Sequence, residues 1–490
     1  MDGRLKKQRR GWLTSYLWSA PSLALIALIV VFPILYTFFI SLTNMNVYHW
    51  FDFTIIGLDN YVKALFVFDS GFLSALINTV LWTVVNMVVQ LILAFVLASL
   101  LNIKRLRLRK LYKTLLMFPW AMPGYVSILL WKTGMFNTEF GLLNQWMEKL
   151  GLEAQRWLAS DVSAFICCTV VNLWLALPFM LMIMDGAMQS IDRSYYESAV
   201  LDGANWLQRS WSITIPSIRP IIAPAVIITI FTTFKQFDVI YLLTQQMGAK
   251  TGSGLHTILT YAYENAFITN NYGYSSAISI IIFLLLLAFS ARWQPGGEGG
   301  EMRGRKLREG VGLTVLNIFF VALCFVTLIP ILYALSVSLN GQNALLSSDF
   351  SFLPKDFTLD NYLAVFTGED ILTWFGNSVI LAAATVAISL AAAVPAAYCF
   401  SRRRFPGRRL VLRWLVLLNS FPAILSMFAV YRLLRPLGLV NHRLGLIIVY
   451  TGTMAVFSLW NMKGYFDTIP AEIEEAARMD GATDLQVVTA

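Results

Sequence analysis

Two short stretches of the sequence combine a carboxylate, small residues and a glycine at one spacing. Each begins with glutamate, a small residue and alanine, and continues after two further residues with aspartate and glycine. The first copy consists of Glu197, Ser198, Ala199, Asp202 and Gly203, and the second of Glu475, Ala476, Ala477, Asp480 and Gly481. Carboxylates accept charge-assisted hydrogen bonds from arginine, and glycine takes the left-handed conformation that ends a helix. Small side chains let another surface approach the backbone. The pattern therefore predicts a short helix that docks on a partner.

A simpler interpretation is an amphipathic helix that lies on a membrane surface and needs no partner. One copy alone would leave that alternative open. Two copies with the same glycine stop, at equivalent places in the chain, favour docking.

Charge-free apolar runs place these stretches in a membrane protein. The chain has 490 residues, 57% of them hydrophobic and only 13% charged, whereas a soluble domain carries about 25% charged residues. Runs without Asp, Glu, Lys or Arg, each long enough to cross a bilayer as a helix, cover residues 11–51, 70–103, 162–184, 265–291, 310–348 and 371–401. Only helices or closed barrels satisfy their backbone inside lipid, and no alternating short strands are visible. The sequence predicts an all-α polytopic membrane protein.

About ten transmembrane helices are expected. Their predicted bounds are residues 18–40, 76–100, 115–136, 164–184, 221–243, 276–290, 313–337, 378–398, 411–431 and 444–462. The basic clusters at 6–10, 104–110 and 402–409 all lie on one side if the N-terminus is cytoplasmic, as the positive-inside rule requires. That placement explains the net charge of +9 without nucleic-acid binding.

The chain also repeats itself in parallel order. Residues 58–61 (Leu-Asp-Asn-Tyr) recur at 359–362, residues 78–80 recur at 377–379, and Phe-Pro stands at both 118–119 and 421–422. A glycine-rich stretch at 291–301 separates the copies and reads as a linker. We expect a first domain at 1–290 with six spans, and a second at 302–490 with four spans that ends inside its glutamate motif. Two formerly separate subunits would be joined here.

The glutamate motif resembles the EAA loop of ABC-importer permeases. That loop reads Glu-Ala-Ala, three residues, Gly, nine residues and Ile-x-Leu-Pro; Glu197, Ala199, Gly203, Ile213 and Pro216 match it, with Ser198 and Ile215 as conservative changes. The resemblance implies a type I ABC-importer fold in which the loop is a coupling helix that contacts a cytoplasmic ATPase dimer. The second copy ends before its Ile-x-Leu-Pro element.

Further segments are similar to permeases of the maltose/maltodextrin type. They lie at 141–144, 234–244 and 261–267 in the first half, and at 436–441 and 462–466 in the second. One departure is Gln-Gln-Met-Gly at 245–248, where that family usually has a Gly-Gly-Pro turn. The resemblance implies import of a di- or oligosaccharide through a prokaryotic cell membrane, with an external sugar-binding protein as a further partner.

Neither ATP chemistry nor a cofactor site is evident. The sequence has no G-x-x-x-x-G-K-[ST] motif, so ATP and magnesium are expected on the separate ATPase, and this chain is expected not to be an enzyme. The four cysteines lie in apolar runs and the three histidines are scattered singly. We therefore predict no metal site and no disulfide framework.

Sugar sites pair aromatic faces with amide and hydroxyl groups. On that ground Trp120, Asn172, Trp174 and Tyr241 are candidates for the substrate path, although packing or interfacial roles would explain each as well. Lys235 and Asp238 read as a mutually paired feature near the outer surface.

Two other function classes compete. An ion-gradient-driven secondary transporter would need several ionisable groups near the membrane midplane, and the predicted helices carry almost none. A membrane-embedded sugar-transferring enzyme would need a catalytic domain, and no loop is long enough to hold one.

Overall fold

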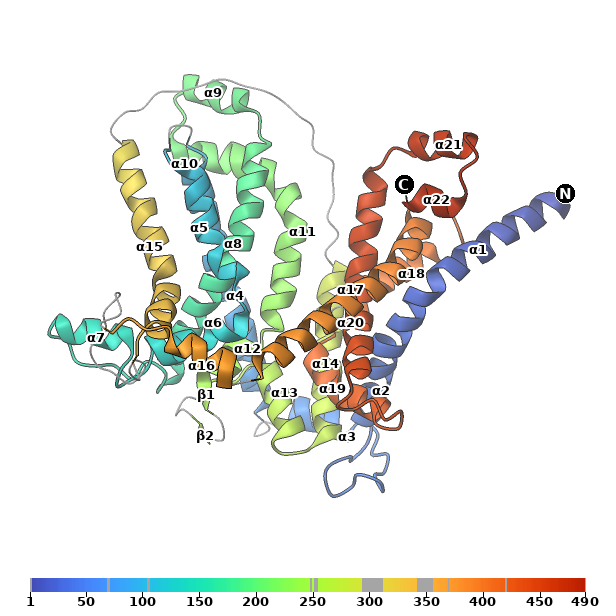
Figure 1. Ribbon diagram of the computed structural model, residues 1–490, viewed down its shortest axis with the longest axis horizontal. Helices are drawn as coiled ribbons and strands as arrows, with labels where there is room; N and C mark the ends of the chain where they lie inside the picture. Colours follow the sequence, from blue (N-terminus) through green and yellow to red (C-terminus); the bar gives the residue numbers. More distant parts are fainter. Residues whose placement is uncertain are drawn as a thin grey trace. The chain divides into compact units, whose positions relative to one another are not determined.

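The computed structural model describes residues 2–67, 71–103, 106–246, 249–250, 254–292, 312–341, 356–368, 370–418 and 421–489. Contacts divide the chain into two compact units. Unit 1 holds Met1–Val67, Ala262–Arg292 and Asp370–Ala490, and unit 2 holds Phe68–Tyr261 and Trp293–Glu369. Figure 1 colours the helices of both units along the sequence.

Unit 2 is a helical bundle with one small β-hairpin. Its elements are α4 (Phe72–Leu101), α5 (Arg109–Ala121), α6 (Gly124–Leu130), the π-turn η3 (Trp131–Met135), α7 (Leu142–Lys149), α8 (Asp161–Gln189), α9 (Arg193–Leu201), α10 (Trp206–Arg209), the π-turn η4 (Ser210–Thr214), α11 (Ile215–Phe234), α12 (Asp238–Thr244), β1 (Gln245–Gln246), β2 (Ala249–Lys250), α15 (Gly312–Ser338) and α16 (Asp360–Gly368). β1 and β2 are antiparallel, with Gln245 opposite Lys250.

Unit 1 consists of helices and connecting loops, with an isolated β-bridge between Thr43 and Ile55. Its elements are α1 (Asp2–Ile26), the π-turn η1 (Ala27–Val31), α2 (Phe32–Ser41), α3 (Asp59–Phe66), α14 (Tyr272–Arg292), α17 (Ile371–Arg402), α18 (Arg408–Leu418), the 3₁₀ turn η6 (Ala423–Ser426), α19 (Met427–Leu434), α20 (Arg443–Thr468), α21 (Ala471–Met479) and α22 (Asp484–Thr489). Helix α13 (Ile258–Phe267) contains the boundary between the units.

The all-α polytopic fold class is confirmed. Within the described part of the chain, eight helices are long and apolar enough to cross a membrane, and a bent pair makes nine. The pair consists of Arg109–Ala121 and Gly124–Met135, which meet at 93°. The ninth expected span, residues 411–431, is not one helix: it divides into α18 and the η6–α19 segment.

Proline causes both interruptions, because its ring removes a backbone donor and clashes with the preceding turn. Pro123 caps α6 at φ −59° and ψ 122°, and Pro422 caps η6 at φ −70° and ψ 105°. Since α5 begins at Arg109 and α18 at Arg408, the structure pairs Pro422 with Pro123 rather than with Pro119, which lies inside α5. The sequence repeat at this point was therefore offset by one helical turn.

The Leu-Asp-Asn-Tyr repeat performs the same task in both halves. The amide of Asn60 donates to the carbonyls of Ser41 and Thr43 at 2.9 and 2.8 Å. In the second copy, the amide of Asn361 donates to the carbonyls of Ser338 and Asn340 at 3.1 and 3.0 Å. Each motif thus ties a short helix, α3 or α16, to the end of the preceding membrane helix.

The compact units do not follow the division expected at residues 291–301. Unit 1 combines α1, α2, α3 and α14 of the first half with the helices after residue 370, and unit 2 contains α15, the first helix of the second half. In unit 2, Tyr112 of α5 stacks on Phe320 of α15 with ring centroids 5.3 Å apart, and the indole of Trp174 donates to the Thr327 carbonyl at 2.9 Å. In unit 1, α1 packs on α17 and α20, where Ile26 and the alanines at 396 and 455 are buried together. The two halves of the sequence therefore exchange their first helices.

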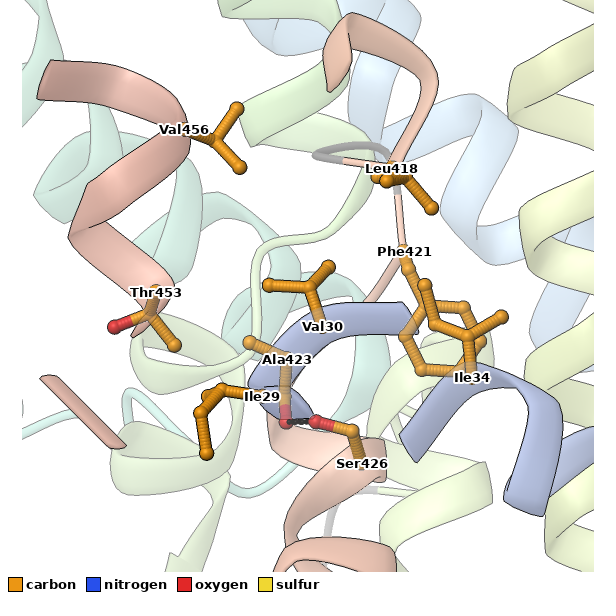
Figure 2. Close-up of a pocket in the computed structure, with 9 residues that line it drawn as sticks. All are labelled: Ile29, Val30, Ile34, Leu418, Phe421, Ala423, Ser426, Thr453 and Val456. Atoms are coloured by element: carbon orange, nitrogen blue, oxygen red, sulfur yellow. Dashed lines mark hydrogen bonds between the residues drawn. The ribbon is translucent and has the colours of Figure 1, made fainter. Parts of the chain in front are cut away.

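A small cavity lies beside η1 in the core of unit 1 (Figure 2). Its volume is about 80 Å³, and its lining consists of Ile29, Val30, Ile34, Leu418, Phe421, Ala423, Ser426, Thr453 and Val456. The Ser426 hydroxyl donates to the Ala423 carbonyl at 2.7 Å. Apolar side chains dominate, so this cavity is a packing gap where the π-turn passes α20 rather than a ligand site.

Candidate functional site

The first glutamate motif forms α9, a two-turn helix capped at both ends. Asp192 begins it by accepting a hydrogen bond from the Ser194 backbone N–H at 2.8 Å. At the other end Gly203 has φ +78°, its N–H donates to the Val200 carbonyl at 3.0 Å, and the Ala204 N–H donates to the Ala199 carbonyl at 2.8 Å. These two bonds are the Schellman closure of a helix.

The second motif closes α21 in the same way. Gly481 has φ +88°, its N–H donates to the Arg478 carbonyl at 3.1 Å, and the Ala482 N–H donates to the Ala477 carbonyl at 3.0 Å. In both copies the alanine and the glycine are therefore spaced so that the glycine ends the helix that contains the alanine. The prediction of a short helix ended by glycine holds in both copies.

Both helices expose a large apolar side chain at the same position. Leu201 ends α9 at 89% exposure, and Met479, its ungapped equivalent, ends α21 at 88%. One turn and a half earlier, Tyr195 and Ile473 are equivalent to each other and exposed as well. The motif's Ser198, Asp202, Glu475, Ala476 and Asp480 are also exposed. Sequence reasoning centred on the glutamate missed Leu201 and Met479, whose only signal was an apolar residue directly before Asp-Gly.

Glu197 faces a pocket under α9. The pocket has a volume of about 500 Å³ and is lined by Ser99, Asn102, Ile103, Arg109, Met188, Gln189, Ile191, Tyr196, Glu197, Trp206, Arg209, Ser210 and Thr214. The Oε1 atom of Glu197 is buried and has no hydrogen-bond partner among the described residues. A buried carboxylate oxygen in that state favours a donor from outside the chain.

The segment after α9 leads back to the membrane as expected. Asn205 and Gln208 form a capping box that starts α10. Ile213 lies in η4, and Pro216 is the second residue of α11, which continues from η4 with a helical backbone. The hydroxyls of Tyr196 and Thr214 lie 2.8 Å apart, and burial raises the pKa of Tyr196 above its ordinary value. That phenol is therefore a neutral hydrogen-bonding group.

The second copy differs in how it joins its bundle. Glu474, which is equivalent to Tyr196, is buried and accepts a hydrogen bond from Arg402 Nε at 2.5 Å and another from the Tyr398 hydroxyl at 3.1 Å. Arg478 donates to the same Tyr398 hydroxyl at 2.5 Å. Helix α21 is thus attached to the end of α17 by an ion pair, whereas α9 stands over a pocket.

The four substrate-path candidates lie in unit 2 but are engaged separately. The Asn172 amide donates to Asn86 Oδ1 at 2.8 Å, and the Trp174 indole donates to the Thr327 carbonyl. Tyr241 stacks on Phe237 with centroids 4.7 Å apart, and Trp120 is 56% exposed. These contacts give each side chain a local role.

Metal ligands do not gather in the described part of the chain. No group of three or more His, Cys, Asp or Glu side chains there could hold an ion. The four cysteines are buried as free thiols.

Comparison with known proteins identifies a family. The family described as "Binding-protein-dependent transport system inner membrane component" matches residues 90–294 and 389–490. One relative is the trehalose/maltose transport system permease protein MalF of Thermococcus litoralis, which is 32% identical over 292 residues, or 59% of this chain and 96% of that protein. Another is the galactooligosaccharides transport system permease protein GanP of Bacillus subtilis, 31% identical over 292 residues, or 57% of this chain and 68% of that protein.

A solved structure shares the fold. It is the bacterial alginate ABC transporter in complex with an alginate pentasaccharide-bound periplasmic protein. The match has a TM-score of 0.50 at 21% identity and covers 58% of this chain and 94% of that one.

Proposed function

This chain belongs to the family of binding-protein-dependent transport system inner membrane components, and we propose that it forms the translocation path of an ATP-driven sugar importer. As a member of that family it is a non-catalytic, multi-pass component of the cell membrane. ATP hydrolysis belongs to a separate cytoplasmic ATPase dimer, which uses the ATP and magnesium.

The observation that supports ATPase coupling most is the pair of helices α9 and α21. Both end in the same glycine closure, and both present an apolar side chain, Leu201 or Met479, almost fully to solvent. Exposed apolar anchors on rigid helices are what a docking groove buries. Glu197 adds a buried acceptor that is suited to a guanidinium group of the ATPase.

The substrate we propose is a di- or oligosaccharide that an external binding protein delivers. The sugars named for the relatives, trehalose, maltose and galactooligosaccharides, support that class. Trp120, Asn172, Trp174 and Tyr241 remain our candidates for contacts along the path, because amides and aromatic faces suit sugars.

We further propose that the chain unites two permease halves around a linker at 291–301, with its N-terminus in the cytoplasm. The two segments of the family match begin in α4 and α17, the helices that the internal repeat pairs. The exchange of first helices supports the same organisation, since each unit needs a helix from the other half.

The test places a charge on each docking helix. We expect Leu201→Asp with Met479→Asp to abolish co-purification of the ATPase and ATP-dependent sugar uptake, because interface anchors contribute about 2 kcal/mol or more each. Leu150→Asp, at a residue that is 76% exposed after α7, is the matched control and is expected to keep both. A second double variant, Glu197→Arg with Glu475→Arg, tests the motif glutamates. Undiminished ATP-dependent uptake in both double variants would refute the proposed coupling.

The same preparation tests the alternative of an ion-driven transporter. Such a carrier would take up sugar in vesicles that lack ATP and would stop when a protonophore removes the gradient. We expect no sugar uptake in vesicles that lack ATP, and ATP-dependent uptake that continues when the protonophore is present.

A further inference from the structure

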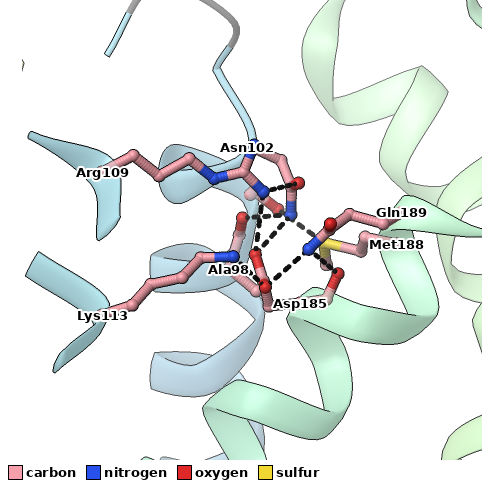
Figure 3. A network of polar contacts seen from close by, with 8 residues as sticks. Ala98, Asn102, Arg109, Lys113, Asp185, Met188 and Gln189 are labelled. Atoms are coloured by element: carbon pink, nitrogen blue, oxygen red, sulfur yellow. Dashed lines mark hydrogen bonds and ion pairs between the residues drawn. The ribbon is translucent and has the colours of Figure 1, made fainter. Parts of the chain in front are cut away.

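A buried carboxylate lies at the root of the first coupling helix, α9. Asp185, in the last turn of α8, is 2% exposed. It accepts hydrogen bonds from Asn102 at 3.0 Å, from Arg109 at 3.4 Å and from Gln189 at 2.6 Å, and it forms an ion pair with Lys113. Figure 3 shows these donors converging on the one carboxylate.

The donors come from three different helices. Asn102 caps the end of α4, Arg109 and Lys113 lie in the first turns of α5, and Gln189 is the last residue of α8. Arg109 also donates to Asn102 Oδ1 at 2.7 Å, so the donors are linked to one another. Asp185 therefore joins α4, α5 and α8 where all three reach the same side of the membrane.

The chain runs from this junction almost directly into α9. Helix α8 ends at Gln189, and Asp192, the N-cap of α9, is itself 4% exposed. A displacement of α9 thus acts first on the last turn of α8. The carboxylate of Asp185 connects that turn to the two neighbouring helices.

The second half contains a related cluster with its charges rearranged, and its carboxylate is more exposed, at 43% of the side chain. In the ungapped alignment of the two glutamate motifs, Lys463 stands for Asp185 and Asp467 for Gln189, and in the separate alignment of α4 with α17, Ser401 stands for Asn102. Asp467 accepts a hydrogen bond from Ser401 Oγ at 2.5 Å and one from Lys463 Nζ at 2.5 Å. The acid has moved one helical turn toward α21, yet it still joins α20 to the end of α17.

We propose that Asp185 is a positioning residue that transmits the movement of α9 to α4 and α5, and that Asp467 transmits the movement of α21 to the end of α17. This inference rests on the proposed function, since it assigns a role within ATPase coupling. Paired charges buried at a helix junction are weak evidence for stability alone, whereas ionisable groups in membrane helices mark functional sites. Separating the carboxylate from its donors would leave unpaired buried charges, so the three helix ends move as one body.

The first variant is Asp185→Asn, which keeps the side-chain size and removes the charge. We expect the number of sugar molecules imported per ATP hydrolysed to fall about tenfold. Co-purification of the ATPase is expected to stay at the wild-type level, because the exposed face of α9 is untouched. A residue that only stabilises the fold would lower protein yield without changing that ratio in the folded fraction.

The second variant transplants the arrangement of the other half. Asp185→Lys, Gln189→Asp and Lys113→Leu together copy Lys463, Asp467 and Leu412 and keep the net charge of the cluster unchanged. We expect this triple variant to restore the ratio to within about twofold of the wild type.

Two results would overturn the proposal. One is a wild-type ratio in the folded Asp185→Asn protein, and the other is a triple variant that folds but stays as uncoupled as Asp185→Asn. Failure of the proposed function has a different signature: the wild-type chain would then bind no ATPase and import no sugar at the expense of ATP, and the role assigned to Asp185 would fall with it.

Discussion

Replacement of Gly203 by alanine tests the helix closure that defines the coupling motif. Gly203 has φ +78°, and a Cβ added there would meet no described atom within 4 Å. The cost therefore comes from the backbone alone, at about 1–2 kcal/mol for an L-residue in the left-handed region. Because the Ala204 N–H bond to Ala199 depends on that conformation, α9 should lose its last turn more often.

Hydrogen exchange followed by mass spectrometry measures this opening directly. A loss of 1–2 kcal/mol corresponds to roughly 5- to 30-fold faster exchange of the amides that close α9. Gly203→Asn should fall between wild type and alanine, because asparagine visits the left-handed region more readily. The rest of unit 2 should exchange at its wild-type rate.

Gly186→Ala is the matched control on the preceding helix. An added Cβ there also meets no described atom within 4 Å, but Gly186 lies inside α8 with a helical backbone. Alanine should therefore slow exchange or leave it unchanged, since glycine inside a helix costs roughly 0.5–1 kcal/mol relative to alanine. Equal exchange of α9 in Gly203→Ala and in the wild type would refute the argument that this backbone conformation holds the motif closed.

Three further predictions concern packing. Gly134→Ala should destabilise unit 2 by about 1–3 kcal/mol in a denaturant titration, because its Cβ would lie 2.5 Å from the Tyr333 ring of α15, and Tyr333→Leu in the same chain should recover part of the loss. Asn172→Ala should cost about 1–3 kcal/mol, since it leaves Asn86 Oδ1 buried without its donor; wild-type stability would contradict this pairing. Gly452→Ala should lower the thermal midpoint of unit 1, because its Cβ would lie 2.4 Å from the Ile29 side chain in η1. An unchanged midpoint would show that η1 moves aside at no cost in stability.

Local signals in the sequence predicted most of the fold. Charge-free runs located most of the membrane helices to within several residues, and the Asp-Gly-Ala pattern located two helix ends that the backbone confirms at Gly203 and Gly481. These features depend on neighbouring residues only. The pairing of Pro119 with Pro422 was wrong. Pro119 and Pro123 lie one helical turn apart, and the sequence does not say which of them matches Pro422 until the start of α5 is known.

Features that depend on distant residues could not be predicted. The predicted fourth helix ended at residue 184, directly before Asp185, and the sequence did not say which cations would meet that acid. Leu201 and Met479 read as ordinary helix residues, because exposure is decided by what packs against them. Likewise, hydropathy identifies α15 as a span but does not assign it to unit 2.

The exchange of first helices has a consequence for how the chain is made. Helix α1 packs on α17, which the ribosome completes about 375 residues later, or roughly 20 to 75 s at ordinary rates of synthesis. During that interval α1 lacks its partners α17 and α20, although α2, which continues the same span, can already pack on α14. Unit 1 is therefore assembled in two stages: α2 and α3 can meet α14 while the first half is made, and α1 is enclosed only after α17 and α20 have been synthesised.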